Sequence, residues 1–398
     1  MNILIEWLGI LGRWAHVLFA ITWIGTSFYF NWLDLSERKP KAPTLKPNVE
    51  GEVHEMHGGS FYYHERFWPT GDNPRTLAHS GPAQFTFLTG LFLVVYFYWR
   101  GPSVYLIPPG SALTVVEAVI ISGLSLLLPW LAYHQICKRV QSDTAVLCVM
   151  AVVVTLSSFV LTRVFNPPAA FVHVGAMLGT IMAANVQYVI IPNHIRMRRQ
   201  VQAGEAVDPT FHKLAKRRSQ HNNYMTLPVL FGMLSAHFPL ATSSELSWAI
   251  LVLVMAALFT LRHYRNVQLR TDRKPRALLW LAVALLACGI GLSFKPRTAA
   301  VEDRSALSAA DARIHEIVQT RCTVCHATTP SFEGFTVAPN GVHLETMAEI
   351  EVRKDQIMTL AIASDLMPPG NLTEMTDAER RELADWLAAK GAVALEQE

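Results

Sequence analysis

The sequence predicts an all-α fold in which eight membrane-spanning helices precede a small helical domain. Hydrophobic residues make up 51% of the 398 positions and charged residues only 16%, which is too apolar for an ordinary soluble enzyme. The apolar residues gather into runs long enough to cross about 30 Å of hydrocarbon. Residues 305–398 lack such runs and are patterned as amphipathic helices.

The apolar runs define a membrane domain over residues 1–294. The predicted spans are residues 8–33, 82–99, 112–134, 145–165, 169–192, 226–244, 246–262 and 277–294. Pro228, His237 and Pro239 interrupt the sixth span, so its limits are the least well defined. The first run holds Arg13 and His16 and no small-residue cleavage site follows it, so we predict a retained span and not a signal peptide.

The distribution of positive charge predicts the orientation of these spans. The loops after spans one, three, five and seven carry about 6, 2, 7 and 6 Lys and Arg residues, whereas the opposite loops carry almost none. Positive charge is retained on the cytoplasmic side. We therefore expect both termini in the periplasm of a bacterial inner-membrane protein, with residues 295–304 as a linker to the C-terminal domain.

The C-terminal domain contains the most specific motif in the chain, Cys322-Thr-Val-Cys325-His326. In a Cys-x-x-Cys-His run the two thiols attach haem covalently and the histidine ligates the iron. A zinc site is disfavoured because no second cysteine pair exists. Cys137, Cys148 and Cys288 lie in or beside apolar runs and are expected to be buried thiols. The motif predicts a monohaem c-type cytochrome over residues 305–398, of class I type.

The rest of this domain fits that prediction. The loop 365–371 presents Met367 beside two prolines and is the candidate source of the second axial ligand, with Met347, Met358 and Met375 as alternatives. Amphipathic helices are expected at about 309–320 and 377–390. Thr376 and Glu379 have the spacing of a capping box for the second.

Histidines in and beside the apolar runs are a second set of candidates. An ionisable residue at membrane depth is costly unless it is paired or functional. His16 and His173 could ligate a b-type haem or another metal, as could His79 and His221, which share an Arg-x3-His-x10-Gly spacing. The same histidines could instead bond helix carbonyl groups. These recurrences also suggest a 4+4 parallel repeat of the membrane domain.

The predicted cytoplasmic loop 34–81 is too long for a simple connection. It concentrates imidazole, carboxylate, guanidinium and aromatic groups, a combination that suits a planar anionic substrate. The candidate catalytic residues are His54, Glu55, His57 and Arg66. His54 and His57 could also bind a metal, and the loop could equally be an amphipathic segment lying on the headgroups. The net charge of +3 is spread over loops and forms no nucleic-acid face.

Taken together, both parts of the chain resemble the bacterial membrane-bound urate oxidases, in which an eight-span domain is fused to a C-terminal cytochrome c. The resemblance is carried by Arg13-Trp-Ala-His16 through Gly25, by Glu52-Val-His54 through Tyr62, and by Cys322 to His326 with Leu366 to Pro369. It implies oxidation of urate to 5-hydroxyisourate, with water as oxygen donor and electrons passing through haem c to a soluble cytochrome c or terminal oxidase without peroxide. It secures roles only for Cys322, Cys325, His326 and Met367.

Other functions remain open at this stage. The membrane domain could merely anchor the cytochrome as an electron conduit for another dehydrogenase. It could also oxidise another compound, such as a porphyrinogen. Copper transport is disfavoured because Met and Cys clusters are lacking on the outer face. If urate binds at the cytoplasmic face, its electrons must cross about 30 Å of hydrocarbon, whereas a site near the outer face needs no bridge.

Overall fold

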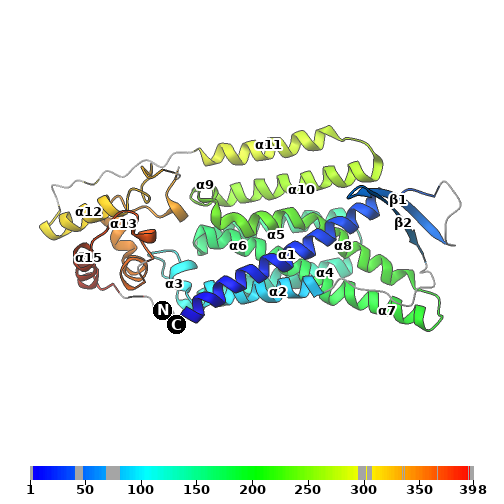
Figure 1. The fold of residues 1–398 in the computed structure, drawn as a ribbon, viewed down its shortest axis with the longest axis horizontal. Coiled ribbons are helices and arrows are strands. Elements are labelled where there is room, and N and C mark those ends of the chain that lie inside the picture. The colour runs from blue at the N-terminus through cyan, green and yellow to red at the C-terminus, as the bar shows by residue number, and fades with distance from the viewer. Residues whose placement is uncertain are drawn as a thin grey trace.

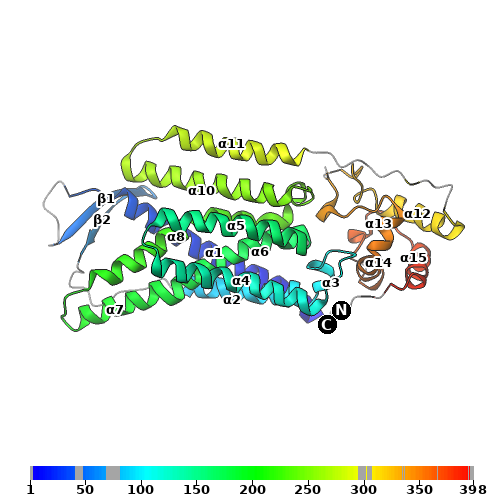
Figure 2. The ribbon, with the colours of Figure 1, turned by 180° about the vertical axis from the view of Figure 1, so that it is seen from behind.

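The computed structural model describes residues 3–40, 48–68, 81–294, 302, 307–333, 335, 337–364, 366–392 and 394. These residues are mostly helical and form a long bundle that carries a β-hairpin at one end and a small helical domain at the other (Figures 1 and 2). We call these the hairpin end and the C-terminal-domain end. The predicted linker, residues 295–304, lies outside the described residues apart from position 302.

Seven helices among the described residues are long and apolar enough to cross a membrane. They coincide with seven of the eight predicted spans. They are α1 (Ile3–Ser36), α2 (Gly81–Leu93) continued by η1 (Val94–Trp99), α4 (Val115–Arg139), α5 (Asp143–Val164), α6 (Pro167–Asn185) continued by η2 (Val186–Ile190) and α7 (Ile191–Gln202), α10 (Ser247–Thr271), and α11 (Arg276–Ser293).

The sixth predicted span, 226–244, differs from the structure. Helix α8 covers Pro209–Leu234, so it begins in a polar segment and ends before the predicted limit. The chain then turns through η3 (Ser235–His237) and α9 (Pro239–Thr242). Pro228 is accommodated inside α8, whereas Pro239 begins a new short helix. The polar half of α8 is not an exposed loop, because several of its polar side chains are buried among the other helices.

The prediction of an all-α fold is wrong within the loop 34–81, where β1 (Val49–His57) and β2 (Ser60–Phe67) form an antiparallel hairpin. Gly58 and Gly59 connect the strands, with φ angles of +57° and +81°. A two-residue turn with positive φ at both positions matches the twist of an antiparallel pair and is open to glycine at little cost. Successive side chains of each strand then point to opposite faces of the hairpin.

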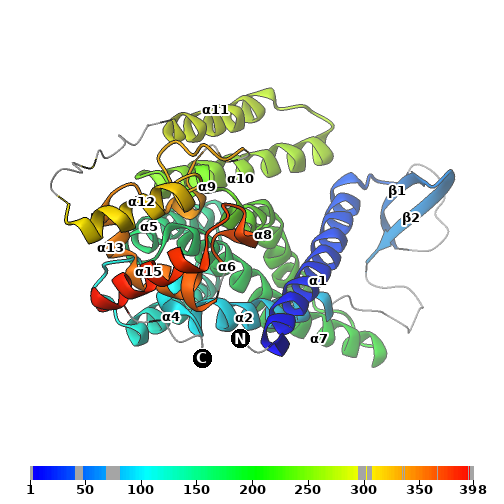
Figure 3. The same cartoon turned by 60° about the vertical axis from the view of Figure 1, so that its left-hand side comes forward.

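Helices α6 and α8 lie in the middle of the bundle, between α1 on one flank and α10 with α11 on another (Figure 3). The two central helices cross at Gly175 and Gly232. A Cβ atom at Gly232 would lie 2.7 Å from the Gly175 Cα atom. Only residues without side chains allow the two backbones to approach this closely.

The C-terminal domain is built from short helices around its own apolar core. The core includes Ile317, Val318, Leu383 and Leu387, all of which are buried. The predicted terminal helices are confirmed, as is the capping box at the start of the second. Its elements are α12 (Ala309–Arg321), η5 (Pro339–Gly341), α13 (Met347–Val352), α14 (Lys354–Ile357), η6 (Met358–Ala363), η7 (Pro369–Asn371) and α15 (Asp377–Ala389).

This domain contacts the end of the bundle where α3 (Pro102–Tyr105) and α9 lie. The Gln356 side chain donates a hydrogen bond of 3.2 Å to the Val104 carbonyl oxygen. Gly341 packs against Ser243, where a Cβ atom would lie 3.1 Å from the Ser243 hydroxyl oxygen. The C-terminal domain is therefore seated directly on the bundle.

Candidate functional site

The cysteine motif forms a tight turn at the end of α12. Cys322 caps the helix, and its carbonyl oxygen accepts hydrogen bonds from the backbone N–H groups of Cys325 (3.1 Å) and His326 (2.9 Å). Burial raises the pKa of the Cys322 thiol to about 12. Cys322, Cys325 and His326 therefore lie in one turn at the same helix end, and this is the spacing at which haem is attached covalently.

The His326 ring has the orientation expected of a metal ligand. Its Nδ1 atom donates to the Val342 carbonyl oxygen at 3.1 Å, and the Leu344 N–H bonds back to the His326 carbonyl oxygen at 2.9 Å. A histidine held in this way through Nδ1 presents Nε2 to a metal. The donor set of Cys322, Cys325 and His326 therefore fits haem c.

Met367 lies in a loop held at two points of the backbone. Its N–H donates to the Leu360 carbonyl oxygen at 2.9 Å, and its carbonyl oxygen accepts from Arg380 Nη1 at 3.1 Å. Met347 and Met375 are buried in the apolar core, and Met358 packs against it. The partly exposed Met367 is thus the methionine least committed to the core, which suits the axial role that was predicted for it.

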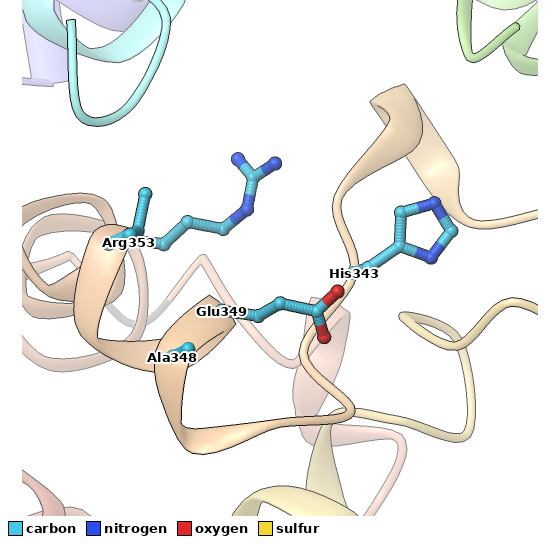
Figure 4. Close-up of a pocket in the computed structure, with 5 residues that line it drawn as sticks. His343, Ala348, Glu349 and Arg353 are labelled. Atoms are coloured by element: carbon cyan, nitrogen blue, oxygen red, sulfur yellow. The ribbon is translucent and has the colours of Figure 1, made fainter. Parts of the chain in front are cut away.

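A pocket of about 250 Å³ lies on the C-terminal domain (Figure 4). The side chains of His343, Glu349 and Arg353 line it, with the Glu349 carboxylate between the other two. Glu349 is also the N3 residue of the capping box of α13, where it accepts from the N–H of the N-cap residue Thr346 at 3.1 Å. The pocket therefore has a polar wall held by a helix cap.

The hairpin separates the candidate catalytic residues onto two faces. Because partners in an antiparallel register share a face, Glu55, His57 and Arg66 lie on one face and His54 lies on the other. The His54 ring is exposed and packs against the ring of its cross-strand partner Tyr63, with centroids 4.8 Å apart. The structure therefore does not bring all four residues together.

The face that carries Glu55 points towards α1. Glu55 Oε2 accepts a hydrogen bond of 2.9 Å from the Tyr29 hydroxyl and lies 3.3 Å from His64 Nε2. Arg66 forms ion pairs with Glu37, at the end of α1, and with Glu50 on β1. Arg66 thus ties the hairpin to α1, whereas the Glu55–His64 pair provides a partly exposed proton acceptor.

The intramembrane histidines have different environments. His173 is fully buried; its Nδ1 lies 2.7 Å from the Ala169 carbonyl oxygen and its Nε2 lies 2.8 Å from the Ser122 hydroxyl. Both of its ring nitrogens are therefore engaged within the bundle. The Nδ1 atom of His16 lies 3.1 Å from the Thr86 carbonyl oxygen and 3.1 Å from the Thr89 hydroxyl.

His221 Nδ1 lies 2.8 Å from the Tyr133 hydroxyl, whereas His79 lies outside the described residues, as does Arg75. In the part of the chain that the structure describes, no group of three or more His, Cys, Asp and Glu side chains is arranged to hold a metal ion. The 4+4 repeat stays a prediction. Its paired positions have different partners, because His16 bonds to α2 and His173 bonds to Ser122 on α4.

A buried polar cluster around Tyr133 was not predicted from the sequence. It lies near the hairpin end, where α4, α6 and α8 meet. Asn185 Nδ2 donates to the Tyr133 hydroxyl (3.1 Å) and to Asn222 Oδ1 (2.9 Å), and the Arg218 guanidinium lies 4.8 Å from the Tyr133 ring centroid. All of these side chains except Asn222 are at least 95% buried, and Asn222 is 91% buried.

Comparison with known proteins gives one match. A family model described as the urate oxidase N-terminal region matches residues 2–293, which is the whole helical bundle with its hairpin. Neither curated proteins nor solved structures gave a significant match. The match stops before the C-terminal domain.

Proposed function

Because the chain belongs to the urate oxidase N-terminal family, we propose that it is a membrane-bound oxidoreductase that converts urate to 5-hydroxyisourate. The observation that carries the proposal is that the matched bundle is joined to, and contacts, a domain whose Cys322, Cys325 and His326 fit haem c. Under this proposal, urate oxidation and a one-electron acceptor occur in one chain.

The reaction balances without dioxygen. Urate and one water give 5-hydroxyisourate, two protons and two electrons, and the new C–O bond takes its oxygen from water. When bound, haem c would accept electrons singly and release them to a soluble cytochrome c or a terminal oxidase of the respiratory chain. No peroxide is formed, because dioxygen is not the oxidant.

The chain's own residues must then receive protons near the substrate. We propose that the hairpin supplies these acceptors: Glu55 paired to His64, His57 on the same face, and the exposed His54 on the opposite face. Arg66 positions the hairpin through Glu37 and Glu50. In the orientation that the loop charges predict, the hairpin is cytoplasmic and the C-terminal domain is periplasmic.

A second haem or metal inside the bundle is a separate proposal, with His16, His79, His173 and His221 as candidate ligands. His173 could take part only by giving up its hydrogen bond with Ser122, since both of its ring nitrogens are engaged. We therefore derive no step of the reaction through such a group. An extractable haem b in the purified chain would support its presence.

The proposed function is tested by a pyridine haemochrome spectrum and by anaerobic addition of urate to the purified, detergent-solubilised chain. We expect the haem c spectrum, and reduction of that haem by urate. Dithionite reduction provides the control for competent haem. If dithionite reduces the haem and urate does not, the proposed urate oxidation is contradicted. That result would favour a membrane-anchored electron conduit for another dehydrogenase.

Met367→Ala is expected to leave haem covalently attached while opening its sixth coordination position. A methionine ligand raises the haem potential. We expect the midpoint potential to fall by more than about 60 mV, which is a tenfold change in the equilibrium constant of a one-electron couple. We also expect carbon monoxide to bind the reduced form. Spectroelectrochemistry measures both, with Met358→Ala as the matched control. An unchanged potential in Met367→Ala would show that another side chain is the ligand.

A further inference from the structure

Arg218 on α8 is a buried cation with an unsatisfied hydrogen-bond donor. The residue is only 5% exposed, and its Nη1 atom has no hydrogen-bond partner. Arginine stays protonated in proteins, so burial does not neutralise it. A buried cation without an anionic partner is strongly unfavourable. An anion bound beside Arg218 would therefore be stabilising.

The nearby carboxylate does not supply this anion. Asp143, at the start of α5, lies 2.6 Å from Arg217 Nε and 3.2 Å from His221 Nε2. None of the ion pairs formed between described residues includes Arg218. The cluster therefore carries two guanidinium groups and one carboxylate, which leaves it with an excess positive charge.

A hydrogen-bond acceptor is also unsatisfied in the same cluster. The amide nitrogen of Asn185 makes two hydrogen bonds, to Tyr133 and Asn222, but the buried Asn185 Oδ1 has no partner. Asn185 and Arg218 both contact Tyr133, the first at its hydroxyl and the second over its ring. An unpaired cationic donor and an unpaired acceptor are thus placed around one aromatic residue.

We propose that Arg218 and Asn185 bind the substrate anion, an inference that rests on the proposed function. Urate is a planar monoanion near neutral pH, with carbonyl-type oxygens and ring N–H groups. Its oxygens suit the planar guanidinium of Arg218, and one ring N–H can donate to Asn185 Oδ1. Tyr133 provides an aromatic surface beside both. The ligand would satisfy the two groups that the protein itself leaves unpaired.

The location of the cluster fits this role. Tyr133 lies near the end of α4, and Arg218 lies in the polar half of α8, both towards the hairpin end. The same end carries Glu55 and His64, the proposed proton acceptors. Binding in the cluster therefore places the substrate within the matched family region and away from the C-terminal domain.

Binding of labelled urate to the solubilised, haem-containing full chain under anaerobic conditions tests the inference. For Arg218→Gln we expect the dissociation constant to rise roughly 10- to 100-fold, the range for loss of a charge-assisted hydrogen bond. Arg198→Gln is the matched control, since Arg198 is an exposed arginine on α7 near the same end. Its affinity should stay within about twofold of wild type, as for a surface change.

Asn185→Asp keeps the test decisive if Arg218→Gln does not fold. A carboxylate at this position supplies the missing counter-charge, so the variant should be at least as thermostable as wild type. The same carboxylate would occupy the anion position and should weaken urate binding by at least about tenfold. A stable Asn185→Asp variant that binds urate like wild type would overturn the inference.

The outcomes separate this inference from the proposed function. If wild type binds urate and reduces its haem, and both cluster variants fold and bind urate normally, the site lies elsewhere and the function stands. If wild type neither binds urate nor is reduced by it, both proposals fail. Weak binding confined to Arg218→Gln and Asn185→Asp supports the site.

Discussion

Replacing His326 with alanine is expected to leave a folded bundle that has lost haem-linked urate oxidation. The His326 ring is oriented through its bond to the Val342 carbonyl oxygen, an arrangement that presents Nε2 to iron. Without that ligand, we expect no normal low-spin haem c spectrum and at least about a thousandfold loss of urate-dependent reduction, as when a residue essential to a catalytic unit is removed. Haem staining and a pyridine haemochrome spectrum provide the measurement.

His315 provides the matched control for this experiment. It is a second buried histidine of the C-terminal domain, and its Nε2 lies 3.1 Å from the Glu345 carbonyl oxygen. His315→Gln should lower the stability of the domain but retain the haem c spectrum. A normal spectrum in His326→Ala would instead exclude His326 as the proximal ligand, and the domain would then need another assignment.

The parts of the fold that follow from local sequence were predicted correctly. Apolar length identified the seven long helices, because a membrane-length run of apolar residues has few alternative structures. The capping box of Thr376 and Glu379 located the last helix to within one residue. In both cases the signal lies within one short segment and does not depend on distant partners.

The hairpin was missed although its signal was present in the sequence. Gly58-Gly59 is a dipeptide typical of two-residue hairpin turns, and the strand-favouring aromatic residues Phe61, Tyr62 and Tyr63 follow it. Because successive side chains of a strand point to opposite faces, His54 lies on the face opposite Glu55 and His57.

The proposed anion site around Arg218 could not be predicted in the same way. In the sequence, Arg217 and Arg218 form part of a basic segment and add to the loop charge that predicts the orientation. Their roles separate only in three dimensions, where Arg217 pairs with Asp143 and Arg218 is buried beside Tyr133. Burial of a polar helix half depends on distant helices, so no local pattern shows it.

The crossing of α6 and α8 is expected to be the most sensitive point of the bundle. In Gly232→Val, the new Cβ atom would lie 2.7 Å from the Gly175 Cα atom, so the two backbones must separate. Overpacking of this kind costs about 1–3 kcal/mol, and more where backbone must move. We expect a clearly lower thermal transition of the detergent-solubilised chain, measured by intrinsic fluorescence.

The same substitution should also impair function, because the crossing sets the spacing of the helices that carry Asn185 and Arg218. Gly291→Val is the matched control, since Gly291 lies on the long apolar helix α11 and a Cβ atom there meets no atom within 4 Å. If helix propensity alone mattered, both variants would behave alike. Equal stability and equal urate affinity in the two variants would show that the close approach of Gly175 and Gly232 does not position the cluster.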